Sequence, residues 1–518
     1  MPALPGSFAS RRAAAGGFPF LPADEIAMHA PSVTLSERQR LAVVVGALVV
    51  LLLAALDQTI VSPAMPTIGA SLGDVEWLSW IVTAYFLTST AVTPLYGKLC
   101  DLKGRQPTLQ VAVAIFSLGS LACALAPSMA VLVIARAIQG IGGGGLVSIV
   151  QTIIGDVVPP AQRARYMVYI STTWAVASVA GPLAGGVFAE HLHWSMIFWI
   201  NLPLAAIAIV VIRRAMAGLP DVTHPARLDL VGSVLVVAAT VAFMLALTWG
   251  GVSLPWTSPI VLGLFAGSGL LYAVFAVHVV RTPDALIPLA VLRNPVVAVT
   301  VSAIFFSMGA YVGLSVYVPL WFELVMGLPP ATAGFGLMAL TLGTVAGAST
   351  AGRAMARVVH YRRIALAGSA LAIVAVATLA GFAGSLGFWG AEVLLALAGF
   401  GTGTVFPIGT VATQNAVARS ELGTAMGVLA FVRSLGSVVA VSVLGAILVA
   451  SGVAGIGEAT AHVGTADPAA AGAFTRAFAA VVVGQAIGFA ILLFLEERPL
   501  HSGPRTAAPA KGDDQAGG

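Results

Sequence analysis

The sequence predicts an all-α polytopic membrane protein. Three observations predict this class: 58% of the 518 residues are hydrophobic, only 9% are charged, and the apolar residues form long runs. A helix needs about 20 apolar residues to cross a hydrocarbon core of roughly 30 Å. Because backbone groups inside lipid must be satisfied within their own segment, runs of this length form helices.

The apolar runs fall into fourteen segments of membrane-spanning length. In chain order we expect transmembrane helices at 41–63, 76–97, 106–125, 129–152, 164–188, 194–213, 229–249, 259–280, 295–324, 332–358, 362–383, 387–416, 422–450 and 473–495. The flanking stretches 1–40 and 496–518 are small and polar in composition, which predicts disordered cytoplasmic tails. Within the first tail, Met28 is the expected physiological start.

The basic residues predict the orientation of the chain. All but three of the 25 lysines and arginines lie in the tails, in alternate loops or at helix ends that face one side. The exceptions are Arg136, Arg433 and Arg476, and Arg433 is expected to snorkel or to pair locally. The positive-inside rule therefore predicts a multi-pass protein of the cytoplasmic membrane with both termini in the cytoplasm.

An internal repeat predicts how the helices are grouped. GIGGG at 140–144 recurs as GFGTG at 399–403, each time in the fourth helix of a six-helix block. We expect two bundles, 41–214 and 295–495, separated by two inserted helices at 229–280.

Arg136 is a permanent charge inside an apolar segment. A charge at that depth costs roughly 3 kcal/mol, so it usually faces a polar interior and has a function. The second repeat has Leu395 at the matching position, so the helix itself does not require an arginine. The adjacent glycines satisfy a nucleotide-binding spacing, but no strand precedes them, and we expect them to admit a neighbouring helix or the substrate.

Two carboxylates also lie inside apolar segments, Asp57 in the first helix and Glu323 in the ninth. Counting along the helices places Asp57 and Arg136 in the same half of the membrane, with Glu323 nearer the outer face. A carboxylate beside an arginine can bind and release a proton as its surroundings change. The alternatives are a static ion pair for Asp57 and a water-exposed helix end for Glu323.

The turn GKLCDLKGRQP at 97–107 resembles the signature loop of the major facilitator superfamily. Four further stretches support this resemblance and point to its fourteen-helix drug/proton antiporter family of EmrB/QacA type. They are LDQTIVSPAMP at 56–66, RAIQG at 136–140, AGPLAGG at 180–186 and WSMIFWINLP at 194–203. The resemblance implies the major facilitator fold, with two six-helix bundles and two inserted helices.

The resemblance assigns an inner gate to the first turn. Its residues would be Gly97, Asp101, Gly104 and Arg105, with Asp156 as a partner. The alternative, basic residues that only set topology, does not explain the aspartate or the glycine spacing. The corresponding loop of the second half has lost the aspartate and the second glycine, so we expect a weaker role for it.

The motif AGPLAGG marks exporters in the family that the chain resembles. Gly181 and Gly185 form a small-xxx-small face, Pro182 permits a kink, and Gly186 completes the motif. The alternative is a motif that serves helix packing alone.

The resemblance also places Asp57, Arg136 and Glu323 around one central polar site. The expected substrate contacts are polar, aromatic and sulfur side chains suited to flat hydrophobic cations. They are Gln58, Gln139, Trp174, Phe306, Met308, Tyr311, Tyr317 and Trp321. The alternative for each is a packing or lipid-facing role.

These expectations combine into a proton-coupled efflux antiporter that works by alternating access. Asp57 would accept the proton, Arg136 would modulate it, and the proton gradient would supply the energy without a cofactor. We expect a monomer in the lipid bilayer that exports hydrophobic, cationic compounds and is neither an enzyme nor a metal or nucleic-acid binder. The alternatives are an exporter of one endogenous metabolite or antibiotic, and a lipid translocator.

Overall fold

A computed structural model describes residues 36–217, 227–251, 253–355, 358, 360–453 and 468–497 of the chain. Within these ranges every named element is a helix. Fourteen of the described helices are long and apolar enough to cross a membrane. The all-α class and the number of spanning helices predicted from sequence are confirmed.

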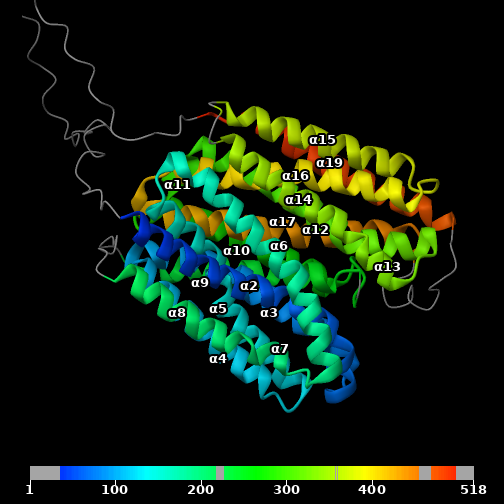
Figure 1. Cartoon of the computed structure of the whole chain (residues 1–518), viewed down its shortest axis with the longest axis horizontal. Coiled ribbons are helices and arrows are strands. Elements are labelled where there is room, and N and C mark those ends of the chain that lie inside the picture. Colours follow the sequence, from blue (N-terminus) through cyan, green and yellow to red (C-terminus); the bar gives the residue numbers. More distant parts are fainter. Residues whose placement is uncertain are drawn as a thin grey trace, which may run out of the picture.

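The first six-helix bundle forms the lower half of the molecule in Figure 1. Its spanning helices are α2 (Glu37–Leu72), α3 (Leu78–Lys103), α4 (Arg105–Ala124), α5 (Met129–Val157), α6 (Pro160–His191) and α8 (Asn201–Met216), with the short η1 (Val75–Trp77) and α7 (Met196–Trp199) between them. The expected tail 1–40 is wrong at its end, because α2 already begins at Glu37. Ser36 Oγ accepts from the Gln39 backbone and the Gln39 side chain accepts from the Ser36 backbone, a capping box that starts the helix early. Residues 1–35, with Met28, lie outside the described chain.

The second bundle forms the upper half of Figure 1. Its helices are α12 (Pro295–Met326), α13 (Pro330–Phe335), α14 (Leu337–Met355), α15 (Tyr361–Gly381), α16 (Phe388–Ala416), α17 (Leu422–Ala450) and α19 (Pro468–Leu492), with the short α11 (Leu289–Arg293) before it and η2 (Arg419–Glu421) between α16 and α17. Of the expected second tail, only Glu496 and Glu497 are described. Glu497 accepts from the Arg362 backbone at 2.7 Å, which ties the chain after α19 to the start of α15.

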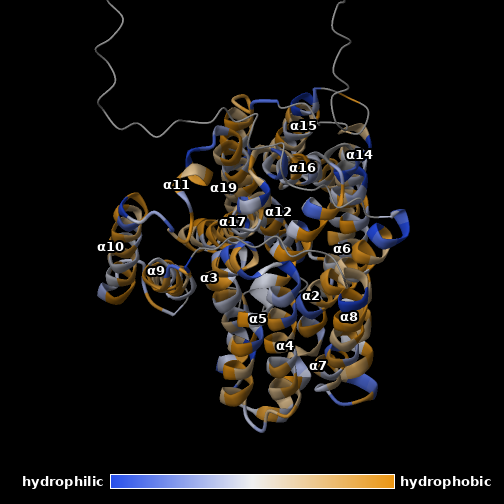
Figure 2. Cartoon of the chain, turned by 90° about the vertical axis from the view of Figure 1, so that its left-hand side faces the viewer, coloured by the Kyte–Doolittle hydropathy of each residue, from blue (hydrophilic) through white to orange (hydrophobic). Residues whose placement is uncertain are grey.

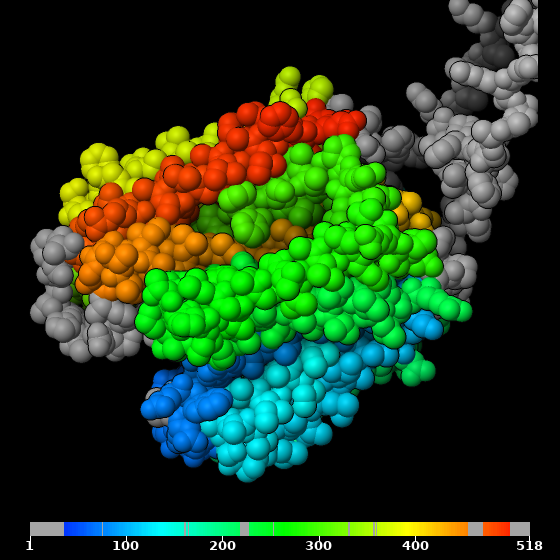
Figure 3. All heavy atoms as spheres, turned by 180° about the vertical axis from the view of Figure 1, so that it is seen from behind, coloured from blue at the N-terminus to red at the C-terminus, as the bar shows by residue number. Residues whose placement is uncertain are grey.

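The inserted helices α9 (Leu230–Trp249) and α10 (Pro259–Arg281) pack against each other beside the two bundles. Figure 2 shows the pair set to one side, and Figure 3 shows it as a layer between the first bundle and the last helices. α9 contacts α3 of the first bundle and α17 of the second, where Ser442 Oγ donates to the Leu247 carbonyl at 3.4 Å. The inserted pair therefore spans the line along which the bundles meet.

The two ends of the helices lie on opposite sides of the molecule and have different roles. The start of α2 and the end of α19 lie at the same end (Figure 1), which we call the terminal side. The next helix, α3, starts near the far end of α2 and runs back. The turn between α3 and α4 therefore also lies on the terminal side. The other end is called the opposite side.

The glycines of α5 let neighbouring helices approach its backbone. A Cβ at Gly142 would collide with the backbone of α4 at Phe116, and one at Gly145 would lie 2.6 Å from the Tyr96 ring of α3. A Cβ at Gly143 would collide with the Tyr85 hydroxyl. These glycines thus serve helix packing, as expected from the sequence.

Candidate functional site

A buried ion pair lies inside the first bundle. Asp57 of α2 and Arg136 of α5 are 0% and 1% exposed, and Oδ2 lies 2.9 Å from Nη1. Arg136 also donates to the Ile81 carbonyl at 3.0 Å and to Gln139 Oε1 at 2.7 Å. The predicted pairing of Asp57 with Arg136 is confirmed. A pair removed from water in this way is sensitive to the loss of either charge.

The other oxygen of Asp57 accepts from two amides. Gln139 Nε2 and Asn201 Nδ2 donate to Oδ1 at 2.8 and 2.9 Å. Asn201 Nδ2 also donates to Ser120 Oγ at 3.0 Å, while Asn201 Oδ1 has no partner among the described residues. Four helices, α2, α4, α5 and α8, therefore meet in one polar network, which we call the Asp57 network.

Two features of the Asp57 network differ from the sequence expectation. Gln139 is wrong as a substrate contact, because it is fully buried and both ends of its amide are bonded within the network. Asn201 and Ser120 were missed as partners of the site. An amide inside an apolar segment, as Asn201 is in WSMIFWINLP, is the signal that points to such a partner.

The cavity of the protein lies between the two bundles and has a volume of about 990 Å³. On α3 its lining residues run from Val82 to Thr93, and on α17 from Leu429 to Val449. It therefore stops short of the terminal side and extends to the loop after α9 at the opposite side, where Trp256 lines it. Met244, Leu247 and Thr248 of α9 are part of its wall, which gives the inserted pair a role in the site.

Tyr85 connects the cavity to the Asp57 network. It lines the cavity, and its ring centroid lies 4.4 Å from the Arg136 guanidinium carbon, within cation–π range. Sequence reasoning did not select Tyr85, because a tyrosine in an amphipathic helix is usually a packing residue. Among the expected substrate contacts, Gln58, Trp174, Met308, Tyr311 and Tyr317 also line the cavity.

Phe306 and Trp321 are wrong as substrate contacts. On α12 the cavity face contains Ile304, Met308, Tyr311 and Val312, a helical spacing that turns Phe306 away toward Gly488 of α19. Trp321 is fully buried, and its Nε1 donates to the Ala383 carbonyl at 3.1 Å. Both residues pack within the second bundle.

Glu323 does not share a site with Asp57 and Arg136, so that expectation is wrong. It is a partly buried residue near the end of α12 in the second bundle. All partners of Asp57 come from α5 and α8 of the first bundle. Equal depth in the membrane does not bring residues together when they belong to different bundles.

The terminal side is closed by contacts between the bundles, beginning with Asp101 of α3. Its carboxylate accepts from the Gly423 and Thr424 backbone at 2.9 and 2.7 Å, and from Thr424 Oγ1 at 2.8 Å. These groups form the N-terminus of α17, where backbone donors and the helix dipole favour an anion. Asp101 therefore caps a helix of the opposite bundle.

Arg105 connects Asp101 to Asp156. Its guanidinium lies 3.3 Å from Asp101 Oδ1 and 2.7 Å from Asp156 Oδ2, and it donates to the Arg419 carbonyl at 2.9 Å. The expected partnership of Asp101, Arg105 and Asp156 is confirmed as a geometry. The role of these three residues as a gate during transport is part of the proposed function.

A second set of hydrogen bonds connects α6 of the first bundle to α16 of the second. Arg163 donates to the Gln414 carbonyl at 3.3 Å and to Asn415 Oδ1 at 2.5 Å. Gln414 Nε2 donates to the Gln151 carbonyl at 2.9 Å. Burial lowers the pKa of Arg163 to about 10, so it stays charged at neutral pH. Sequence reasoning used Arg163 only for topology and missed this contact.

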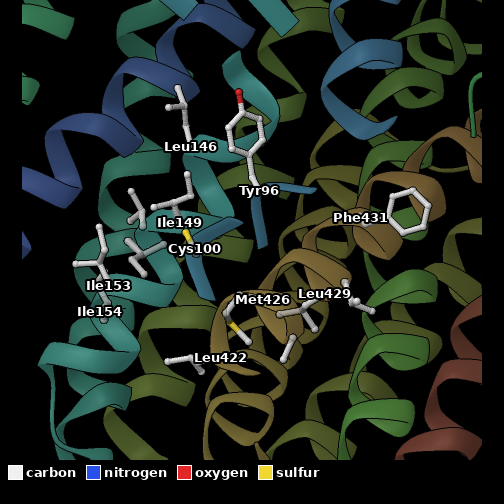
Figure 4. Close-up of a cluster of buried hydrophobic side chains, with 14 of the residues drawn as sticks. Tyr96, Cys100, Leu146, Ile149, Ile153, Ile154, Leu422, Met426, Leu429 and Phe431 are labelled. Carbon is white, nitrogen blue, oxygen red and sulfur yellow. The ribbon is translucent and has the colours of Figure 1, made fainter. Parts of the chain in front are cut away.

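The glycines of the signature turn have distinct roles. Gly104 adopts φ of 94°, which favours glycine at the sharp turn between α3 and α4. Gly97 lies where α3 and α17 approach most closely, since a Cβ there would be 2.5 Å from the Gly423 carbonyl oxygen. Figure 4 shows part of the apolar cluster at this contact, in which Tyr96 and Cys100 of α3 lie between side chains of α5 and Met426 of α17.

In AGPLAGG, both glycines of the expected packing face contact α2. A Cβ at Gly181 would collide with Thr59 and one at Gly185 with the Ile60 carbonyl, whereas Gly186 faces open space. Pro182 lies inside α6 as expected. The loop of the second half behaves differently from the first turn: Arg362 bonds to the chain after α19, within its own bundle.

The fold and the site together define a class of protein. Two repeated helical bundles enclose a cavity that is closed at one side by contacts between the repeats, which is the arrangement of an alternating-access membrane transporter. The family model described as Major Facilitator Superfamily matches residues 47–441. The chain belongs to this superfamily and is a transporter, not an enzyme.

Its relatives among known proteins include efflux pumps. The chain is 33% identical over 396 residues to "Efflux pump dotC" of Dothistroma septosporum (strain NZE10 / CBS 128990), covering 75% of this chain and 68% of that protein. It is 29% identical over 418 residues to "Multidrug transporter protein MdtP" of Bacillus subtilis (strain 168), covering 80% and 76%. Among solved structures, the human organic anion transporter MFSD10 (TETRAN) has a TM-score of 0.62 at 18% identity, covering 88% of this chain and 99% of that one, a likeness of fold alone.

Proposed function

We propose that this protein is a proton-coupled antiporter that exports hydrophobic compounds across the cytoplasmic membrane. The observation that carries the proposal is the position of the Asp57 network: a carboxylate and an arginine, buried and paired, lie directly behind the cavity wall at Tyr85. Similarity to efflux pumps supports the direction of transport.

Asp57 holds the transported proton in this mechanism. Protonation removes its charge and ends the ion pair with Arg136, so the two states of the network differ in electrostatic energy. A protonated carboxyl needs an acceptor, and the free Asn201 Oδ1 supplies one if the amide turns over. Arg136 keeps its contact with Tyr85, so a change in the network reaches the cavity wall.

In this mechanism the terminal side alternates between a closed state, in which Asp101 contacts α17, and an open state, in which these contacts are broken. In the state described here they are formed and the cavity extends to the opposite side. Breaking them lets the bundles rock apart at the terminal side, where basic residues favour a cytoplasmic location. The exported compound then enters from the cytoplasm or inner leaflet, and the protein acts as a monomer with both termini in the cytoplasm.

The substrate class differs in one respect from the sequence expectation. The described lining residues of the cavity include no carboxylate that would neutralise a cationic substrate. The proposed substrates are hydrophobic compounds without a cationic preference.

Transport in proteoliposomes tests the proposal. Ethidium, Nile red and 1-anilinonaphthalene-8-sulfonate provide a cation, a neutral dye and an anion. We expect at least one dye to accumulate against its concentration gradient only while an imposed pH gradient persists, and Asp57→Asn to abolish this accumulation while folded protein remains in the membrane. Uphill accumulation that continues after the pH gradient is collapsed, or in the Asp57→Asn variant, contradicts proton coupling.

A further inference from the structure

The cavity contains an unpaired cation. Among the described residues that line it, Arg433 of α17 is the only one with a charged side chain. Its guanidinium has no ion pair or hydrogen bond to any described part of the chain. The sequence predicted that Arg433 snorkels or pairs locally, and this is wrong because the residue faces the cavity.

Two other buried arginines of the spanning helices behave differently. Arg105 and Arg136 are each paired with carboxylates at 2.7 to 3.3 Å and bonded to backbone carbonyls. A structural arginine in this protein is therefore satisfied by its neighbours. Burying an arginine partly in an apolar cavity without a counter-ion is unfavourable, and a functional site is the usual reason to retain one.

Arg433 lies at the closed end of the cavity. It is one helical turn after Leu429, the first residue of α17 that lines the cavity, and about 16 Å along the helix from Leu422 at a rise of roughly 1.5 Å per residue. The aromatic side chains of α12 lie further toward the opposite side, because Tyr311 and Tyr317 follow Ile304 and Met308 along that helix. The cavity is therefore charged at its closed end and aromatic along its wall.

We propose that Arg433 binds the acidic group of the exported compound, and that the substrates are hydrophobic organic carboxylates. This inference rests on the proposed export function and names its substrate class. The planar guanidinium fork binds a carboxylate through two parallel hydrogen bonds, and the apolar surroundings strengthen them. The ring system of the substrate lies against the aromatic wall, whereas a cation is repelled by the unneutralised arginine.

Binding of three matched probes to the full-length protein in nanodiscs tests this assignment without a proton gradient. The probes are anthracene-9-carboxylate, anthracene-9-methanol and anthracene-9-methylammonium, which differ mainly in charge. We expect the carboxylate to bind at least about tenfold more tightly than the other two, since a hydrogen-bonded charge pair contributes roughly that factor or more. Arg433→Gln should lose this preference and Arg433→Lys should keep part of it. Val443→Ala, on an exposed face of the same helix and outside the cavity lining, should keep all of it.

Thermal unfolding of the ligand-free variants separates binding from a structural role. Removing an unpaired buried charge should leave Arg433→Gln at least as stable as the wild type, the pattern of a residue kept for function. Carboxylate binding by Arg433→Gln equal to wild type, preference for the ammonium probe, absence of carboxylate binding, or clear destabilisation of Arg433→Gln would each overturn the assignment. Because the assay needs no gradient, carboxylate binding that depends on Arg433 can hold even if proton coupling fails.

Discussion

The two six-helix bundles place their charges differently. The first encloses a complete ion pair, Asp57 with Arg136, away from the cavity. In the described part of the second, interior polar contacts such as Thr300 with Thr413 at 2.7 Å are neutral, and Arg433 is the only described charge that lines the cavity. In the proposed function the two halves of this repeated architecture therefore differ: the first holds the proton and the second contributes the charge that meets the substrate.

The largest expected effect comes from replacing Arg136 of the first bundle with leucine, the residue at the matching position of the second bundle. Arg136→Leu copies Leu395 and leaves Asp57 buried without its counter-charge, which should destabilise the protein by about 3–5 kcal/mol. The double variant Asp57→Asn/Arg136→Leu should recover most of this loss, because neither charge remains. Thermal unfolding in detergent measures both effects.

Leu395→Met provides the matched control in the second bundle. Leu395 is fully buried in an apolar cluster, and a change that conserves volume should cost less than about 1.5 kcal/mol. If Arg136→Leu and Leu395→Met unfold at similar temperatures, losing the buried ion pair costs no more stability than a conservative core change. This result would contradict the expected difference between the bundles.

The next effect concerns the contact between the bundles. Asp101→Asn weakens the cap on α17, and hydrogen bonds to a charged group contribute roughly 1.5–3 kcal/mol. Cys100 is a native reporter, because it is fully buried beside this contact in the closed state (Figure 4). In a Cys123→Ser background we expect Asp101→Asn to raise the rate of Cys100 labelling by a small thiol reagent at least about tenfold. An unchanged rate would mean that Asp101 does not hold the terminal side closed.

A smaller steric effect is expected at Gly97. Its Cβ would approach the Gly423 carbonyl oxygen to 2.5 Å, so Gly97→Ala should cost the closed state about 1–3 kcal/mol and slow transport. Gly186→Ala is the control, since nothing lies within 4 Å of the added carbon. Equal transport rates in the two variants would argue against close approach of α3 and α17 during the cycle.

The smallest effect concerns the inserted helices, which touch both bundles. Burial raises the pKa of Asp229, but hydrogen bonds from the Gly232 backbone, His278 and the Leu286 backbone outweigh this and hold the pKa below its ordinary value. A lowered folded-state pKa stabilises the protein above the unfolded pKa of about 3.9. The advantage of the wild type over Asp229→Asn, about 1 kcal/mol at neutral pH because the acceptor is charged, should therefore disappear as the pH falls from about 3.9 through the lower folded-state pKa.

Unfolding temperatures of wild type and Asp229→Asn between pH 3 and 7 measure this advantage. Ser258→Ala removes the cap of α10, whose bond to the Ile260 backbone is longer at 3.4 Å and exposed, and it should change little. A difference between wild type and Asp229→Asn that does not depend on pH would contradict the assignment to the carboxylate.

Most of the fold could be predicted from sequence, because segment length and hydrophobicity determine which stretches cross a membrane. The pairing of Asp57 with Arg136 was also predictable from their depth. Rotation about each helix axis was not, which is why Gln139 and Phe306 were placed in the cavity. Depth also says nothing about which bundle a residue faces, and this explains the error for Glu323.

Contacts between the halves were predictable only in part. The signature turn indicated Asp101 and Arg105, but their targets in the second bundle, at the start of α17 and in η2, are mainly backbone groups that no side-chain pattern reveals. Arg433 was visible as a charge in an apolar segment. Its role depends on the absence of a partner in the described chain, which only the packing of the nine helices that line the cavity discloses.

One measurement tests most directly the proposal that proton coupling depends on the first bundle. Proteoliposomes containing wild type or Asp57→Asn are assayed for the best-transported dye in two modes, exchange between equal pH on both sides and uphill movement driven by a pH gradient. We expect Asp57→Asn to keep exchange near the wild-type rate and to lose the driven movement. Loss of both modes, or of neither, would contradict the assignment of proton coupling to the first bundle.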